Sequence, residues 1–320
     1  MNNSSISNFK FFLHSAIAFV AGFLFLLGIA CCIQLSIFEK LFSGSALFLG
    51  KEKTVLFVGD SHFVHAIDPS GDSSWENIAM ASEPFFCSRL KIKKYLEANP
   101  QIEKVCIPYW EHVVLEFPKD YFKRWDAARY NRYYYLFDFE TRKTSFQNLE
   151  QGARCFLVYG LGVPLEWQTR TLKYLRGASP PFQGGFHAHE QRTEQPNSLE
   201  KTIGRHYYKN ETVRHISTQR EGAMLKEMIA LTEENGVQLI LISTPVEMAY
   251  DEQVPATIKQ EFERRSASIT NRYPQVSYID SRAFFHSKGN EADYFYDSDH
   301  LNKIGATKFS EHVSECLKKK

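Results

Sequence analysis

The sequence has no excess of charge of either sign. Its 320 residues carry 38 Lys and Arg against 37 Asp and Glu. The lysines that end the chain, 318–320, are interpreted as a solvated tail. Nucleic-acid binding requires a basic patch or stripe, which this balance does not indicate. We therefore expect no nucleic acid among the partners of this protein.

The six cysteines lack the spacing of a metal or redox motif. Cys31 and Cys32 are adjacent, and the other four are scattered widely along the chain, with no C-x-x-C pair. A disulfide framework is therefore not indicated. Cys106 lies in an apolar run and is expected to be a small buried hydrophobe. A single Cys87–Cys155 disulfide stays open.

Metal-binding clusters are also lacking. His187, His189 and His206 are the histidines closest to such a pattern, but no acidic residue stands at a convincing ligand spacing from them. We expect no metal and no other cofactor, which ranks a two-metal phosphoesterase last among the candidate functions.

Charge is absent from one long stretch. After a polar tail, residues 1–10, no charged residue occurs from Phe11 to Phe38. This run exceeds the ~20 residues that cross a bilayer as a helix and is longer than the apolar part of a cleaved signal peptide. We predict one transmembrane anchor over 11–38. The stretch from Leu27 to Cys31 is similar to a lipobox, so a lipid anchor remains an alternative.

The rest of the chain, 51–320, alternates between strand and helix patterns. Strands are predicted at 54–58, 75–80, 104–110, 237–243 and 276–280. Helices are predicted at 85–98, 221–235, 256–272 and 303–317. Such alternation predicts a parallel sheet covered by helices on both faces, an α/β fold built as a three-layer α/β/α sandwich.

Residues 118–215 interrupt this alternation. They are rich in aromatic and cationic residues at 121–137 and in Gly, Pro and His at 179–189. Because ordinary connections are much shorter, we predict an insertion that forms a helical cap, with a looser loop near 178–200. The rings of 121–137 are expected to pack, and a sugar-stacking face or a membrane-interface contact stays open.

The candidate nucleophile is Ser61. It follows the buried strand pattern of 55–58 and the Gly59–Asp60 turn. Open α/β sheets bind ligands at the carboxyl ends of their strands, where this serine is expected to lie. A serine here could also act only as a helix cap.

A base and an orienting acid are supplied near the other end of the chain. Asp297 stands three residues before His300, just ahead of the C-terminal helix. In a catalytic triad, His300 would take the Ser61 proton and Asp297 would hold the other ring nitrogen. Asp299 is the rival orienter or a helix cap.

These motifs together resemble the SGNH (GDSL-type) hydrolase superfamily. Gly59-Asp60-Ser61 and Asp297-x-x-His300 are similar to its first and last blocks. The likeness is closer to a membrane-anchored branch that includes teichoic-acid D-alanylation and alginate acetylation proteins. It implies a flavodoxin-like fold, a Ser61, His300 and Asp297 triad, and an extracytoplasmic domain, although Lys40, Lys51 and Lys53 after the anchor argue for the opposite orientation.

The oxyanion hole is where the sequence departs from that superfamily, which adds a Gly after the second strand and an Asn after the third. Neither is present here. A backbone N–H of Ala81 or Ser82 is the candidate after the second strand, and Tyr109 or His112 after the third. His62 and His65 are interpreted as polar residues of the first helical turn, and contact with the substrate stays open.

The sequence leaves two candidate functions. The first is a membrane-anchored serine esterase or O-acyltransferase that acts on acyl esters, acetyl among them, of cell-envelope glycans through an acyl-Ser61 intermediate. Its partners would be an acylated glycan or polymer and a membrane-embedded acyl donor protein. The alternative is an inactive protein of the same fold that binds a glycan or a membrane acyltransferase.

Overall fold

The computed structural model describes residues 11–26, 28–29, 47–111, 115, 133, 136, 184–192, 199–209, 212–214 and 220–319. The chain divides into two compact units, residues 1–46 with 126–182, and residues 47–125 with 183–320. Each unit is considered by itself.

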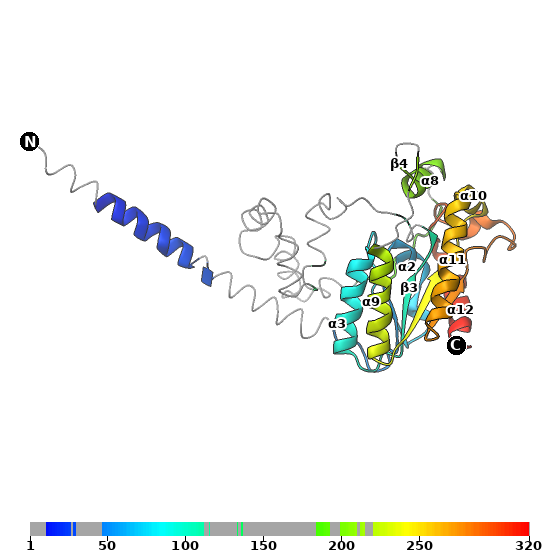
Figure 1. The fold of residues 1–320 in the computed structure, drawn as a ribbon, viewed down its shortest axis with the longest axis horizontal. Coiled ribbons are helices and arrows are strands. Elements are labelled where there is room, and N and C mark those ends of the chain that lie inside the picture. The colour runs from blue at the N-terminus through cyan, green and yellow to red at the C-terminus, as the bar shows by residue number, and fades with distance from the viewer. Residues whose placement is uncertain are drawn as a thin grey trace, which may run out of the picture. The chain divides into compact units, whose positions relative to one another are not determined.

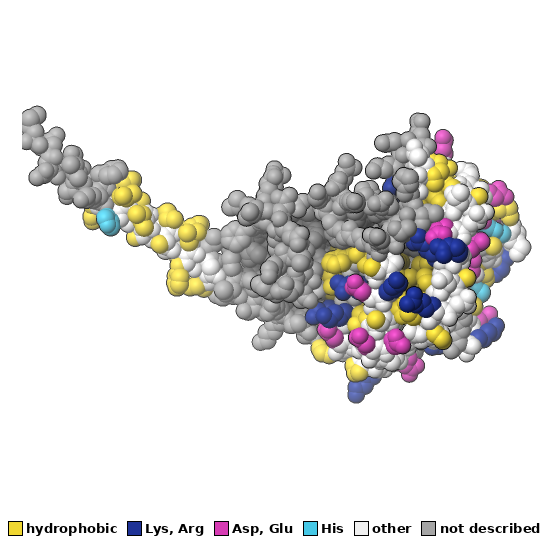
Figure 2. Space-filling model, in the orientation of Figure 1, with side chains coloured by type: hydrophobic (Ala, Val, Ile, Leu, Met, Phe, Trp, Pro, Cys, Tyr) yellow, Lys and Arg dark blue, Asp and Glu magenta, His cyan; other side chains and the backbone are white. Residues whose placement is uncertain are grey.

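In the first unit, residues 11–26 form a helix. Its apolar side chains are exposed, among them Phe11 at 77% and Phe19 at 75%, and hydrophobic side chains dominate the visible side of this helix in Figure 2. Within the described ranges, none of the helices combines the length and the apolar character that crossing a bilayer requires. Much of the predicted anchor, 11–38, lies outside those ranges, and the anchor stays a prediction.

The second unit contains a parallel sheet of five strands in the order β2–β1–β3–β6–β7. The strands are β1 (Val55–Phe57), β2 (Trp75–Asn77), β3 (Lys104–Pro108), β6 (Gln238–Ser243) and β7 (Val276–Asp280). The predicted α/β class with a parallel sheet is confirmed. This order is doubly wound: from β1 the chain adds β2 on one side of the sheet and then β3, β6 and β7 on the other. Ligands bind at such a switch point, which here lies between β1 and β3.

Helices cover both faces of this sheet (Figure 1). The helices are α2 (Ser61–Ala66), α3 (Phe85–Ala98), α8 (Leu199–Tyr207), α9 (Arg220–Glu234), α10 (Met248–Gln253), α11 (Ala256–Arg272) and α12 (Lys303–Lys318), with short 3₁₀ turns η1 (Pro69–Gly71) and η4 (Glu291–Tyr294). A two-stranded hairpin, β4 (Tyr208–Lys209) and β5 (Thr212–Val213), follows α8. Helix α2 contacts α12, whereas α3 contacts α9.

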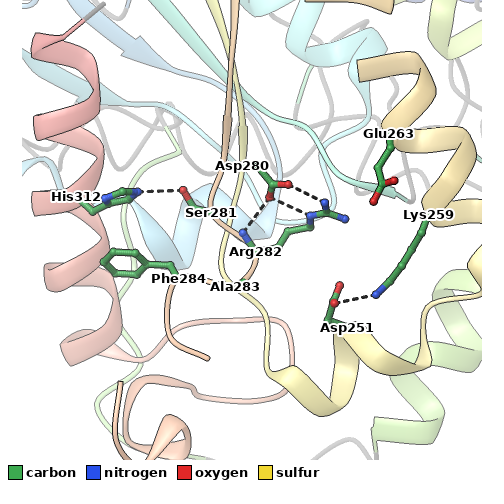
Figure 3. Close-up of a pocket in the computed structure, with 9 residues that line it drawn as sticks. All are labelled: Asp251, Lys259, Glu263, Asp280, Ser281, Arg282, Ala283, Phe284 and His312. Carbon is green, nitrogen blue, oxygen red and sulfur yellow. Dashed lines mark hydrogen bonds and ion pairs between the residues drawn. The ribbon is translucent and has the colours of Figure 1, made fainter. Parts of the chain in front are cut away.

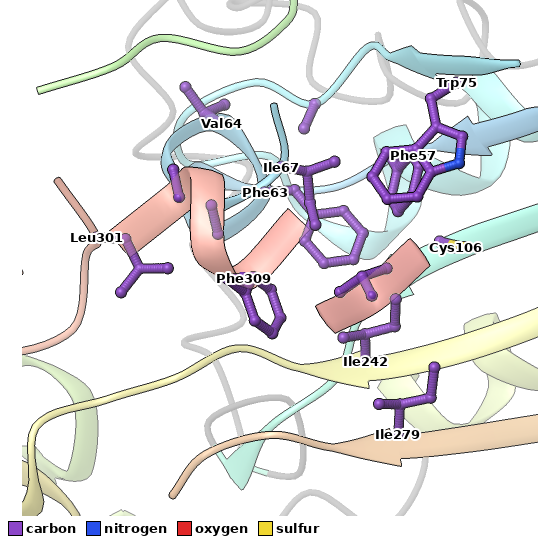
Figure 4. Packing of buried hydrophobic residues seen from close by; sticks show 14 of the residues in the cluster. Phe57, Phe63, Val64, Ile67, Trp75, Cys106, Ile242, Ile279, Leu301 and Phe309 are labelled. Carbon is purple, nitrogen blue, oxygen red and sulfur yellow. The ribbon is translucent and has the colours of Figure 1, made fainter. Parts of the chain in front are cut away.

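The pleat of the strands explains these two layers, because alternate residues point to opposite faces. Phe57, Cys106 and Ile240 are register neighbours on three adjacent strands. They pack with Phe63 of α2 and Phe309 of α12 in one buried cluster, drawn in Figure 4. This cluster fixes α2, which begins at Ser61, against the C-terminal helix.

The predicted strands and helices agree with the structure to within a few residues, except at two places. The second strand ends at Asn77 rather than at Met80, because the Asn77 side chain donates to the carbonyls of Phe63 and Ile67 and accepts from the N–H of Ala79. The predicted cap, 118–215, lies mostly outside the described residues, and its end forms α8 and the β4–β5 hairpin.

We expect Gly305→Ala to destabilise the protein by about 1–3 kcal/mol, the usual cost of an overpacked core site. A Cβ at Gly305 would lie 2.1 Å from the carbonyl oxygen of Tyr294. The matched control is Gly204→Ala in α8, where nothing lies within 4 Å of the added carbon and helix propensity should raise stability slightly. Chemical denaturation measures both, and equal effects would contradict the expected clash.

Candidate active site

Ser61 lies where β1 turns into α2. Gly59 permits the turn, since its φ of +152° is disfavoured for other residues and a Cβ there would lie 2.2 Å from Cδ of Pro108. Asp60 caps the helix, and its side chain accepts the N–H of His62 at 3.0 Å. Ser61 is therefore the first residue of α2 at the carboxyl end of β1, and it is partly exposed.

The loop that carries His300 is held between η4 and α12. A bridge between Phe295 and Leu301 closes the loop. At its end the Asn302 side chain accepts the N–H of Gly305 at 3.0 Å and donates to the carbonyl of Asp293 at 2.8 Å. The loop is thus anchored on both sides, which fixes where its Asp and His point.

The structure brings the three predicted catalytic residues together. His300 Nε2 lies 2.9 Å from Ser61 Oγ. On the other side of the ring, His300 Nδ1 lies 2.9 Å from Asp297 Oδ1 and 3.1 Å from Asp297 Oδ2. These contacts join residues 239 positions apart in the sequence. This is the arrangement in which a nucleophile, a base and an orienting acid would lie in hydrogen-bond contact.

A second carboxylate, Asp299, also faces the catalytic histidine. Its Oδ1 lies 3.4 Å from His300 Nδ1, beyond hydrogen-bond length. Burial alone would lower the pKa of His300, but Asp299 and Asp297 outweigh burial and raise it to about 10. Burial alone would likewise raise the pKa of Asp299, and His300 with the neighbouring histidines holds it well below its usual range instead. The two carboxylates therefore favour the protonated form of the His300 ring.

Other histidines surround this pair. His62 stacks on His300 with centroids 5.1 Å apart, and His65 meets it edge-on at 5.2 Å. Burial lowers the pKa of His65 to about 4, although its bond to the His187 carbonyl opposes this. Burial likewise lowers the pKa of His206 to about 4, against the field of Asp299. Burial therefore disfavours a positive charge on His65 and on His206.

Donors for an oxyanion are arranged around Ser61. As the first residue of α2, Ser61 has an N–H without an intrahelical partner. The loop after β2 is pinned beside it, because the N–H of Met80 donates to the Gly59 carbonyl at 2.8 Å. Ser82 in this loop has φ +60°, the one positive φ of a non-glycine residue in the described ranges. Such strain clusters at functional sites, and Ala81 and Ser82 remain the predicted donors.

A buried ion pair connects this loop to α3. Lys91 of α3 contacts both Glu83 and the Ile78 carbonyl, and both charged side chains are fully buried. Ser88 donates to the other Glu83 oxygen at 2.8 Å. Burial raises the pKa of Glu83 to about 7 against the opposing effect of Lys91. The loop that carries Ala81 and Ser82 is thereby tied to α3.

We expect Lys91→Met to cost about 3–5 kcal/mol in unfolding free energy, because it leaves the Glu83 carboxylate buried without its partner. The double variant Glu83→Gln, Lys91→Met should regain most of this loss. Equilibrium denaturation of the single and double variants is the measurement. A double variant that loses as much as the sum of the singles would contradict the pairing.

The predicted donors after the third strand are not supported. The Tyr109 ring packs against Phe262 of α11 and Tyr278 of β7, with centroids 5.1 and 6.1 Å away, and burial raises its pKa to about 12. Tyr109 is therefore a packing residue of the opposite sheet face. His112 lies outside the described residues. The residue that reaches the site from this end of β3 is Trp110, whose ring lies 4.1 Å from that of His62.

His62 lies in the first turn of α2, as expected, but it is buried there rather than exposed to solvent. Its side chain is only 4% exposed and is held by Asp60 Oδ1, 3.1 Å from Nδ1. His62 Nε2 lies 3.8 Å from Asp299 Oδ2, and His206 Nδ1 lies at the same distance from that oxygen. No sequence spacing indicated this grouping, because α8 and the Asp297–His300 loop are far apart in the chain.

Residues 184–192 border the site. The N–H of Gly185 donates to the Ala79 carbonyl, and that of His187 to the Val64 carbonyl. His189 stacks on Tyr296 with centroids 3.6 Å apart. His65 Nδ1 lies 2.8 Å from the His187 carbonyl oxygen. This segment therefore lines one side of the Asp297–His300 loop with imidazole rings, one of which stacks on the phenol ring of Tyr296.

A cavity of about 470 Å³ lies at the end of β7, with none of the triad residues in its lining. Four of its five charged side chains form two ion pairs, and Figure 3 draws the fifth, Glu263, without such a contact. Lys259 lies 2.8 Å from Asp251, and Arg282 lies 2.7 Å from Asp280. Since these charges neutralise each other, we assign no ligand to this cavity.

Comparisons with known proteins give only distant matches. No protein-family model matches the sequence, and no curated protein matches it significantly. A GDSL-like lipase from Bacteroides thetaiotaomicron is 12% identical, with a TM-score of 0.37 over 87% of this chain and 94% of that chain. An acylhydrolase candidate from Bacteroides fragilis is 10% identical, with a TM-score of 0.37 over 83% and 87%. At this level of similarity, the geometry of the site carries the functional assignment.

Proposed function

We propose that this protein is a serine esterase or O-acyltransferase that works through an acyl-Ser61 intermediate. The observation that carries the proposal is the continuous contact from Ser61 Oγ through His300 to Asp297. A serine hydroxyl is a weak nucleophile at neutral pH, and a base held in this way activates it. Nothing else in the described chain gives the three residues a common structural task.

The proposed reaction has two steps. Ser61 Oγ attacks the ester carbonyl while His300 Nε2 takes its proton, and the N–H groups of Ser61 and of Ala81 or Ser82 stabilise the oxyanion. The C–O bond to the alcohol breaks as His300 returns the proton to the leaving oxygen. Water or a sugar hydroxyl then attacks the acyl-Ser61 ester, with His300 again as the base.

The first experiment follows acetyl-ester hydrolysis and acyl-enzyme formation by mass spectrometry of the intact protein. Wild type should gain one acetyl group from p-nitrophenyl acetate, and Ser61→Ala should gain none. Adding an acetyl acceptor such as an oligosaccharide separates the two activities. Transfer to the sugar supports an acyltransferase, and release of acetate alone supports an esterase.

We further propose that the substrate is an acylated glycan or polymer of the cell envelope, reached from a membrane tether. Support comes from the charge-free run of residues 11–38 and from the exposed apolar side chains of helix 11–26. A membrane-embedded acyl donor protein would be the partner of a transferase, and the domain would then face the extracytoplasmic side. Flotation of the full chain with lipid vesicles, compared with a chain lacking residues 1–46, tests the tether.

A second candidate is binding without turnover. It is favoured by the packing of Tyr109 against α11, which leaves the described part of the chain after β3 without the third oxyanion donor that the resemblance implies. Failure of the wild type to form an acyl-enzyme with any activated ester, despite a normal thermal transition, would select this candidate.

A further inference from the structure

We propose that His62, Asp299 and His300 form a zinc site whose occupation blocks the catalytic histidine. One ligand atom from each residue lies within 4.8 Å of the others, and this is the one such grouping in the described ranges. Two imidazoles and a carboxylate are a donor set that Zn²⁺ takes in protein sites with an open fourth position. The site shares one residue with the triad but uses the opposite ring nitrogen.

Asp299 provides the strongest observation. Its side chain is 1% exposed, and neither of its oxygens accepts a hydrogen bond from a described group. A buried carboxylate without hydrogen bonds is costly, and bound cations are one way in which proteins satisfy it. Three histidine nitrogens lie 3.4–3.8 Å from its oxygens, so the charge of Asp299 is balanced by imidazoles that a bound cation can bridge.

The separations within the cluster suit a shared metal ion better than hydrogen bonds. Asp299 Oδ1 lies 3.4 Å from His300 Nδ1, and Asp299 Oδ2 lies 3.8 Å from His62 Nε2. Ligands about 2.0–2.2 Å from a tetrahedral zinc ion stand roughly 3.3–3.6 Å apart. The three ligand atoms lie within 4.8 Å of one another, so the side chains must draw closer to reach this geometry.

His62 is prepared for this task by Asp60. The Asp60 carboxylate lies 3.1 Å from His62 Nδ1, so it can hold the Nδ1–H of a zinc-bound imidazole whose Nε2, which lies 3.8 Å from Asp299 Oδ2, binds the ion. Metal-binding histidines commonly donate their second ring nitrogen to a carboxylate in this way. His206 Nδ1, 3.8 Å from Asp299 Oδ2, offers a fourth nitrogen, although Tyr250 Oη now lies 2.7 Å from it.

Zinc bound to His300 Nδ1 would prevent His300 from acting as a general base. The ion replaces the Nδ1 proton and the contact with Asp297, which leaves the single ring proton of a neutral imidazole on Nε2. That nitrogen then donates to Ser61 Oγ and has no lone pair to accept the serine proton. This consequence rests on the proposed function, whereas zinc binding itself does not.

The test measures zinc binding by the chelator-stripped, full-length protein with a chromophoric zinc indicator and by thermal unfolding. Wild type should bind one more Zn²⁺ than Asp299→Asn or His62→Gln, or bind at least about 100-fold more tightly, and only wild type should gain a higher Tm with zinc. His187→Ala is the matched control, because that histidine borders the site without belonging to the cluster. Binding undiminished in Asp299→Asn would overturn the site.

Two further comparisons separate this inference from the proposed function. Ser61→Ala should bind zinc like wild type, because the serine is not a ligand. Zinc at the concentration that saturates the site should suppress fluorophosphonate labelling of wild type, with recovery on adding EDTA. Labelling that persists with the site filled would refute the inhibitory role, and zinc binding by a protein that never labels would refute only the esterase.

Discussion

The Ser61→Ala variant is expected to lose ester hydrolysis, with kcat lowered about 10⁴- to 10⁶-fold. The hydroxyl is the attacking group, and no other described side chain contacts His300 Nε2. The same replacement should leave stability nearly unchanged, because Ser61 is partly exposed and its side chain packs in no core. Turnover of p-nitrophenyl acetate and the thermal transition, measured on the same sample, test both statements.

Ser298→Ala is the matched control for that prediction. Ser298 lies next to Asp297 in the catalytic loop and is buried, but its hydroxyl has no described hydrogen-bond partner. Its removal should change kcat by less than about threefold. Equal losses in Ser298→Ala and Ser61→Ala would mean that the loop, rather than the nucleophile, had been damaged.

The pH dependence should show the second large effect. His300 acts as a base only when its ring is neutral, and its pKa is raised to about 10. In wild type, kcat/KM should therefore increase as the pH rises through this value, and should be low at pH 7. Removing the charge with Asp299→Asn lowers the pKa of His300, so the rising limb moves to lower pH. Activity at pH 7 should increase roughly tenfold for each unit of that movement.

Asp293→Asn serves as the control for the pH profile. Asp293 is an exposed carboxylate six residues before Asp299 and is not among the groups that shift His300. Its replacement should leave the limb where it is in wild type. If the pH at which kcat/KM rises is unchanged in Asp299→Asn, or is higher than in wild type, the role given to Asp299 would be contradicted.

The parallel sheet and the proximity of Ser61, His300 and Asp297 could be predicted from the sequence because the signals for them are local. Buried strands such as 238–243 are short apolar runs, and helices such as 256–272 carry their own periodicity. Gly59 and Ser61, directly after an apolar run, indicate a tight turn at the end of a strand. Such a turn places the serine at the carboxyl end of the sheet. The Asp297-x-x-His300 spacing brings both side chains onto one loop.

The environment of the triad could not be predicted in the same way. His62 and Asp299 are buried because α8, Trp110 and the Asp297–His300 loop lie close together in the folded chain. These segments are far apart in the sequence, and no periodic pattern indicates that they are in contact. Tyr109 illustrates the reverse case. It stands directly after β3 at the expected place for an oxyanion donor, but the pleat turns its ring to the α11 face. A shift of one residue therefore separates a donor from a packing residue.

The central claim, an activated Ser61, is tested most directly by fluorophosphonate labelling followed by peptide mapping. The protein is labelled at pH 9, where more of His300 is neutral, beside Ser61→Ala and His300→Ala. The account predicts one adduct per chain, located on Ser61, and none in either variant. An adduct on another residue, or labelling that survives the loss of His300, would contradict it.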